Sequence, residues 1–189
     1  MLRRCLVCLT TFDTHISAQL LLLHHYRWTL YYGIKERGPT GFTGLNGVSF
    51  LGIVEIVADV LEMKQSNFNA TDCTGSTDLI WAALRGREQV VKMLLGSEDV
   101  SPDQADTKYG RTPLSFAARG GYEGIVKMLL EREDVNPDQA GTEYGRTPLS
   151  WAARNGHERI VKMLLERREV DPNFRETKNA ETALVTAAM

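Results

Sequence analysis

The sequence predicts an all-α fold, a solenoid of antiparallel helix pairs that stack on one another and are joined by hairpin-like loops. One observation is a repeated phrase, GRTPLS, which stands at Gly110–Ser115 and again at Gly145–Ser150. A second is that both copies are followed by the same two segments, AAR and then IVKMLLER. The two copies are 35 residues apart. A fixed period of this length is typical of repeat proteins, in which each unit is one supersecondary structure packed against its neighbours.

The same period extends through most of the chain. A third copy precedes these two, with Gly75, Thr77 and Trp81 in register, and a degenerate copy lies before it. The predicted units are 41–74, which is degenerate, then 75–109, 110–144 and 145–179, and finally 180–189, which is truncated. Residues 1–40 fit no copy, and we predict that they form a degenerate N-terminal segment or cap.

Each unit contains the signals of two helices. Thr112 and Pro113 predict the start of the first helix, because a Thr side chain accepts from a free backbone N–H and Pro suits the first helical position. Gly121 predicts its end. In the second helix, apolar residues at helical spacing form a stripe, which consists of Ile125, Val126, Leu129 and Leu130. The Asp-, Asn- and Pro-containing loop that follows is typical of turns rather than of calcium ligands.

An aromatic residue occupies the same position in three successive units. Trp81, Phe116 and Trp151 should therefore align in a column when the units stack. Such a column could line a ligand groove or pack between neighbouring helices. We expect packing, since large aromatic side chains contribute most when buried.

The pattern G-x-T-P-L-x-x-A-A-x-x-G-x-x-x-I-V-x-x-L-L, present at 110–130 and 145–165, resembles the ankyrin repeat. Two features depart from that family: Ser115 and Ser150 stand where a His is common, and the loops are about two residues longer than usual. The sequence of these repeats is most similar to that of ankyrin arrays of filamentous fungi. Those arrays are often found C-terminal to nucleotide-binding receptor domains.

The resemblance implies a non-catalytic module that binds a partner protein on the concave face of the stack. Carried over by position, the family's contact residues flank the Gly of the motif and the end of the first helix. They are Lys108, Tyr109, Arg111, Arg119, Glu143, Tyr144, Arg146, Arg154 and Asn155. Tyr and Arg are enriched in interface hot spots, so the repeated Tyr-Gly-Arg is predicted to form a partner-facing ridge. The alternative is that the tripeptide reflects a recent duplication, with each Tyr packed on its own loop.

A second hypothesis makes the chain a fragment of a larger, fungal-type nucleotide-binding receptor whose ankyrin array is the sensor region. The stretch GIKERGPT at 33–40 has the outline of a phosphate-binding loop. Pro39 stands where Lys is required, however, and it supplies neither an amine nor a backbone N–H. We therefore expect no nucleotide site there. No recurring nucleophile, base and orienting residue indicates an enzyme.

Composition restricts the partners further. The formal net charge of −2 argues against a nucleic-acid surface, and His-His-Tyr-Arg interrupts the apolar run at 18–34, which argues against a membrane span. The pair Cys5 and Cys8 lacks a second Cys or His pair for zinc. We thus expect no cofactor, metal or small-molecule substrate, and only a protein partner. An odd count of three Cys predicts a reducing compartment, the cytoplasm or alternatively the nucleus.

Overall fold

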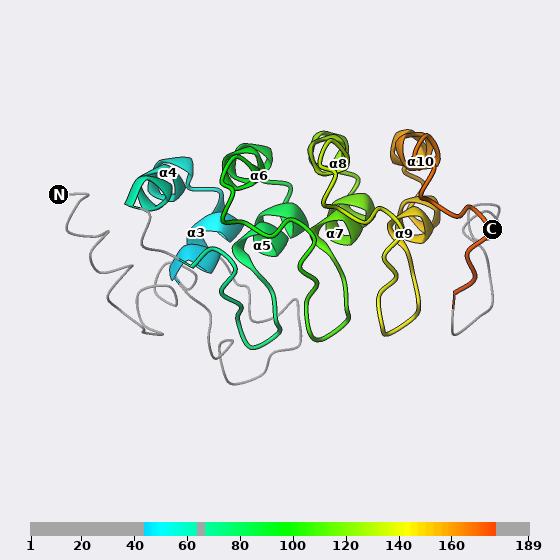
Figure 1. Ribbon diagram of the computed structural model, residues 1–189, viewed down its shortest axis with the longest axis horizontal. Helices are drawn as coiled ribbons and strands as arrows, with labels where there is room; N and C mark the ends of the chain where they lie inside the picture. The colour runs from blue at the N-terminus through cyan, green and yellow to red at the C-terminus, as the bar shows by residue number, and fades with distance from the viewer. Residues whose placement is uncertain (1–43, 64–66, 177–189) are drawn as a thin grey trace.

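The computed structural model describes residues 44–63 and 67–176, and within them it shows eight α-helices and no β-sheet (Figure 1). The helices form four pairs: α3 (Gly44–Leu51) with α4 (Val54–Met63), α5 (Asp78–Leu84) with α6 (Glu88–Leu95), α7 (Pro113–Gly120) with α8 (Glu123–Leu130), and α9 (Pro148–Arg154) with α10 (Glu158–Leu165). The predicted all-α fold of stacked helix pairs is confirmed. The predicted segments 1–40 and 180–189 lie outside the described residues.

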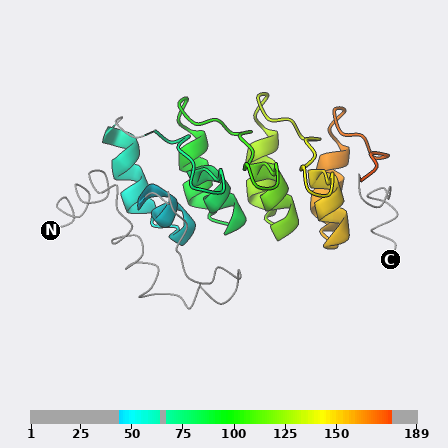
Figure 2. The same cartoon turned by 90° about the horizontal axis from the view of Figure 1, so that it is seen from below.

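The pairs stand side by side in chain order, which gives two rows of helices. The first helices α3, α5, α7 and α9 contact one another in sequence, and the second helices α4, α6, α8 and α10 do the same (Figure 1). Figure 2, turned by 90°, shows the same succession of pairs. The loops that connect one pair to the next extend away from the row of first helices (Figure 1). We call the tips of these loops, residues 70–76, 105–111 and 140–146, the fingers.

The ends of α7 are set by the residues that the sequence indicated. The Thr112 side chain accepts a hydrogen bond from the backbone N–H of Ser115, and Pro113 occupies the first helical position. Gly121 ends the helix in the left-handed conformation, at φ +77°, which a residue with a Cβ rarely adopts. The same Thr cap begins α5 and α9. These local signals repeat from unit to unit, so the first helices begin in register.

The core is continuous along the stack. The predicted stripe of α8 is buried, and the first helices bury small residues such as Ala82, Ala117 and Ala152, which are fully inaccessible to solvent. Small side chains at these positions let neighbouring helices approach closely. The three column aromatics are also buried, each with at most 8% of its surface exposed, so packing rather than an open groove is their role.

Each junction between units places one side chain against a glycine of the preceding unit. Tyr122, which immediately precedes α8, lies on Gly86, where an added Cβ would come within 2.4 Å of the Tyr122 ring. His157 lies on Gly121 in the same way, and its Nε2 is 3.1 Å from the Arg119 carbonyl oxygen. These contacts fix the lateral position of each pair relative to the previous one.

Side chains in the Asp-rich loops connect successive units. The Asp103 Oδ2 atom accepts from the Asn136 N–H at 3.1 Å, and the Asp138 Oδ2 atom accepts from the Asp171 N–H at 3.1 Å. Asn69 occupies the corresponding position one unit earlier, and its Oδ1 atom accepts from the Ser101 N–H at 2.7 Å. The loops therefore form turns, as expected, and each turn also holds the next one in place.

At this loop position, the carboxylates of Asp103 and Asp138 form fewer hydrogen bonds than the amide of Asn69. The Asn69 Nδ2 group donates to the Asp99 carbonyl at 2.6 Å, so both polar atoms of the amide are used. The Oδ1 atoms of Asp103 and Asp138 are buried and have no hydrogen-bond partner among the described residues. Desolvation by burial is the main reason why the pKa of each of these carboxyl groups is raised.

Replacing Asp103 by Asn is expected to stabilise the fold near neutral pH by about 0.5–1.5 kcal/mol, the net value of one hydrogen bond. The folded chain binds the Asp103 proton more tightly than the unfolded chain, because the folded-state pKa is raised. The stability that this group contributes is thus complete below the ordinary aspartate pKa and is lost as the pH rises through the folded-state value. Urea unfolding near neutral pH and in mild acid measures the difference, and the gain should shrink in acid.

The chain supplies its own reciprocal control. Asn69→Asp should destabilise the fold near neutral pH, because it introduces the same unsatisfied carboxylate, and should do so less in acid. If Asp103→Asn changed stability equally at both pH values, the buried Oδ1 atom would not be the cause.

Candidate partner-binding face

The fingers form a row because neighbouring fingers hydrogen-bond through their backbones. The Thr107 N–H donates to the Thr74 carbonyl at 3.0 Å. One unit later, the Thr142 N–H donates to the Tyr109 carbonyl at 2.7 Å. The contact repeats in register, so side chains at matching finger positions lie next to each other along the stack. We define the finger face as residues 70–85, 105–121 and 140–155, which comprise the fingers and the first helices with their caps.

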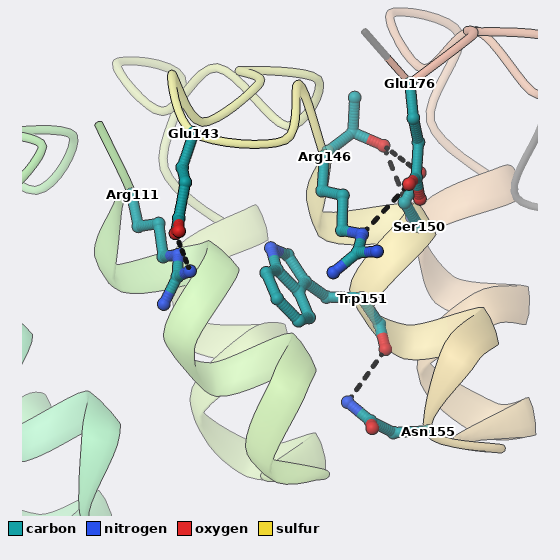
Figure 3. A network of polar contacts seen from close by, with 8 residues as sticks. Arg111, Glu143, Arg146, Ser150, Trp151, Asn155 and Glu176 are labelled. Carbon is teal, nitrogen blue, oxygen red and sulfur yellow. Dashed lines mark hydrogen bonds and ion pairs between the residues drawn. The ribbon is translucent and has the colours of Figure 1, made fainter. Parts of the chain in front are cut away.

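Arg111 connects two fingers from a buried position. Its guanidinium carbon lies 4.3 Å from the centre of the Tyr109 ring and 4.9 Å from that of the Trp151 ring. Its Nη2 atom is 3.1 Å from the Glu143 Oε2 atom in the next finger (Figure 3). Gly141 of the next finger packs closely against the backbone of this one, since an added Cβ would be only 3.0 Å from the Tyr109 carbonyl oxygen. Arg111 therefore ties its own finger to the next finger through Glu143 and to the next first helix through Trp151.

Arg146 repeats this arrangement one unit later. Its guanidinium carbon lies 4.7 Å from the centre of the Tyr144 ring and 4.9 Å from that of Trp151, which places the indole between the side chains of Arg111 and Arg146 (Figure 3). The Arg146 Nε atom is 2.9 Å from the Oε2 atom of Glu176, a residue with 2% of its surface exposed. Guanidiniums attract the faces of aromatic rings, so these contacts favour the stacked geometry.

A third cation lies at the same indole. The Arg119 guanidinium carbon is 5.1 Å from the centre of the Trp151 ring, although the residue itself is exposed. Desolvation by burial, followed by repulsion from Arg119, lowers the pKa of Arg111. The guanidinium stays charged because arginine does not deprotonate in proteins. A hydrogen bond to Glu143 is the main cause that raises the pKa of the Tyr144 hydroxyl, which keeps its proton near neutral pH.

The structure divides the predicted contact residues into three groups. Four are exposed: Lys108, Arg119, Arg154 and Asn155. Three are half-buried: Tyr109, Glu143 and Tyr144. Two are buried, with 9% of their surface exposed: Arg111 and Arg146.

The repeated Tyr-Gly-Arg therefore has a structural use inside the stack. The Tyr109 ring contacts Lys108 and Arg111 of its own finger, as the duplication interpretation expects for the tyrosine. That the predicted residues bind a partner stays a prediction. The face that they would offer consists mainly of the exposed and half-buried groups, with the two buried arginines beneath them.

Two residues of this cluster were missed in the sequence. Trp151 was expected only to pack between helices, and Glu176 was not singled out. The acidic partners follow their arginines at unequal distances, from 111 to 143 and from 146 to 176, so neither pair keeps the period of the repeat. The sequence did contain one signal for the cluster, because an Arg and an aromatic residue recur together in successive units.

Other site types find no support in the described part of the chain. Residues 44–63 and 67–176 contain no group of three or more His, Cys, Asp or Glu side chains that could hold a metal ion. None of the helices described has the length and apolar character needed to cross a bilayer. The Cys5–Cys8 pair and the stretch at 33–40 lie outside the described residues.

Comparison with known families agrees with the geometry. A family model described as ankyrin repeats, in three copies, matches residues 45–140, 97–176 and 134–189. These matches together span well over half of the chain. No curated protein is similar enough to be matched to it.

The ion pair between Arg111 and Glu143 is expected to couple the two fingers energetically. A double-mutant cycle with Arg111→Met and Glu143→Gln, read by urea unfolding, should give a coupling energy above about 1 kcal/mol, because the pair is shielded from water. The exposed fractions of these two side chains are 11% and 33%.

The matched control is the pair of Arg159 with Glu123, which also joins neighbouring units but has side-chain exposures of 80% and 47%. Arg159→Met and Glu123→Gln should couple by only a few tenths of a kcal/mol, as exposed pairs do. Equal coupling in both cycles would show that burial adds nothing to the finger pair.

Proposed function

The chain belongs to the ankyrin-repeat family, and from this premise we propose that it is a non-catalytic module that binds a partner protein through the finger face. Ankyrin repeats are protein–protein interaction modules, and the family is typically non-catalytic. The observation that carries the assignment to this face is its composition, half-buried tyrosines surrounded by exposed Lys, Arg and Asn on a rigid scaffold. The proposed location is the cytoplasm or the nucleus.

The finger face combines a fixed backbone with side chains that differ between units. Position 108 is Lys and the matching position 143 is Glu, while Gly120 corresponds to Asn155. The buried positions around them hardly change, as the repeated Thr caps and alanines show. Loops held by a rigid scaffold are where binding residues concentrate in proteins. Variation on a constant core is what a recognition surface requires.

The tyrosines are suited to the centre of such a contact. Tyr109 and Tyr144 occupy matching positions in adjacent fingers, and each ring is held by the arginine of its own finger. A partner that covered them would gain apolar area without having to order the rings first. Lys108 and Arg154 would then lie at the rim, where charges set orientation and association rate.

Site-specific photo-crosslinking tests the choice of face. A photoreactive amino acid is introduced in place of Lys108 or Arg154 on the finger face, and in place of Lys127 or Lys162, which are exposed on α8 and α10. Each variant is irradiated in a lysate of the organism that encodes the chain. Discrete proteins should be crosslinked from the finger-face positions and not from the two helix positions, as read by mass spectrometry.

The four variants change exposed side chains only, so differences in folding do not explain the result, and thermal unfolding checks this. Crosslinks formed mainly from Lys127 and Lys162 would place the interface on the outer helices. An absence of discrete crosslinked proteins from Lys108 and Arg154 would contradict the proposal.

The alternative is that the array is the sensor region of a larger nucleotide-binding receptor. It predicts a longer parent transcript that encodes an intact phosphate-binding loop, unlike the stretch that contains Pro39. Mapping both ends of the transcript tests this directly. A transcript that encodes only the printed sequence would contradict it.

A further inference from the structure

Charge on the finger face is sorted by burial. Its exposed charged side chains are all basic, namely Lys108, Arg119 and Arg154. Its carboxylates are either buried, as Asp72 and Asp106 are, or engaged in an ion pair, as Glu143 is. The surface that a partner meets on this face is therefore positive, although the whole chain has a net charge of −2.

The buried carboxylates are occupied by internal hydrogen bonds. The Asp72 Oδ1 atom accepts from the backbone N–H groups of Thr74 and Ser76, and its Oδ2 atom accepts from the Trp81 indole at 3.2 Å. The Asp106 Oδ1 atom accepts from the Tyr109 N–H. These carboxylates organise the fingers, and the oxygens named here accept from internal donors.

The row of second helices has the opposite balance. On α6, α8, α10 and the turns that follow them, exposed Asp and Glu side chains outnumber exposed Lys and Arg. A positive face opposite an acidic row of helices attracts and orients a negatively charged partner and repels it from that row.

Two of the exposed cations recur with the period of the stack. Arg119 and Arg154 lie at matching positions in the last turns of α7 and α9, and neither forms an ion pair within residues 44–63 and 67–176. Packed helices lie about 8–10 Å apart, so matching positions on neighbouring first helices recur at about that distance. Tyr109 and Tyr144 recur in the adjacent fingers with the same interval along the chain.

We propose that the finger face binds an acidic, proline-rich segment that lies along the stack as a polyproline II helix with a carboxylate at every third residue. This helix has three residues per turn and rises about 3.1 Å per residue, so residues three apart share one side at about 9 Å. That distance falls within the interval of about 8–10 Å expected between matching positions on neighbouring first helices. The intervening prolines pack on Tyr109 and Tyr144, since aromatic surfaces are the usual docking sites of such helices. The inference rests on the proposed function.

The test uses labelled peptides and the full chain. The probe is a repeated Glu-Pro-Pro peptide, and the comparison peptide has the same composition and charge but carries its glutamates in adjacent pairs. Fluorescence anisotropy at low ionic strength should show tighter binding of the Glu-Pro-Pro peptide by roughly fivefold or more, because only its carboxylates match the spacing of the cations. Binding should weaken as salt is added.

Variants identify the face. Arg119→Ala with Arg154→Ala should weaken binding of the Glu-Pro-Pro peptide by about tenfold, whereas Arg159→Ala with Arg168→Ala, which removes the same charge from exposed positions after α9, should change it by less than about twofold. Arg119→Lys with Arg154→Lys should restore most of the affinity. Thermal unfolding confirms that each variant is folded. Equal binding of the two peptides, or equal loss in the two alanine variants, would overturn the proposal.

The outcome separates this inference from the proposed function. If the Glu-Pro-Pro peptide does not bind while Lys108 and Arg154 still crosslink a protein from the lysate, the finger face binds a partner of other chemistry and only the inference fails. If neither experiment detects binding at this face, both fail.

Discussion

The structure depends on one constraint, that the apolar side of each helix pair can be buried only by the next pair. The described first helices from α5 onward have seven or eight residues and the second helices eight, and isolated helices of that length are marginal in water. Their stability therefore comes from tertiary packing. Alanines such as Ala117 allow the close approach that this packing needs. Because each pair contacts its neighbours in the same way, every further contact between units is repeated at nearly the same interval.

Repetition explains why deviations from it are informative. The finger contact between Thr74 and Thr107 recurs between Tyr109 and Thr142, so backbone geometry is the same at both junctions. Gly141 departs from the pattern, and the absence of a Cβ there lets the finger lie close to the Tyr109 carbonyl of the preceding finger. The loop position held by Asn69 in one unit and by carboxylates in the next two is another departure. There the backbone hydrogen bond is kept while the second polar atom loses its partner.

The features that could be predicted from the sequence depend on adjacent residues or on the repeat period. The features that could not be predicted depend on contacts between residues that are distant in the chain and do not follow that period. The start of α7 at Pro113 follows from the Thr112 cap, and the apolar stripe of α8 follows from helical spacing, so both were predictable from a few adjacent residues. The burial of Arg111 and Arg146 depends on Trp151 and on glutamates at unequal distances along the chain. Arginine is rarely buried unless paired, so without those partners in view its exposure was the natural expectation.

On the finger face, the buried arginines support the structure, whereas the exposed arginines are available to contact a partner. Arg111 and Arg146 hold the fingers and Trp151 in one arrangement, and their charges are balanced by Glu143 and Glu176. Arg119 rests on the same indole but keeps its exposure, so part of the entropy cost of ordering its side chain is met before any partner arrives. A contact residue supported in this way loses less freedom on binding than a free surface arginine would. Trp151, expected only to pack between helices, thus also positions the cations around it.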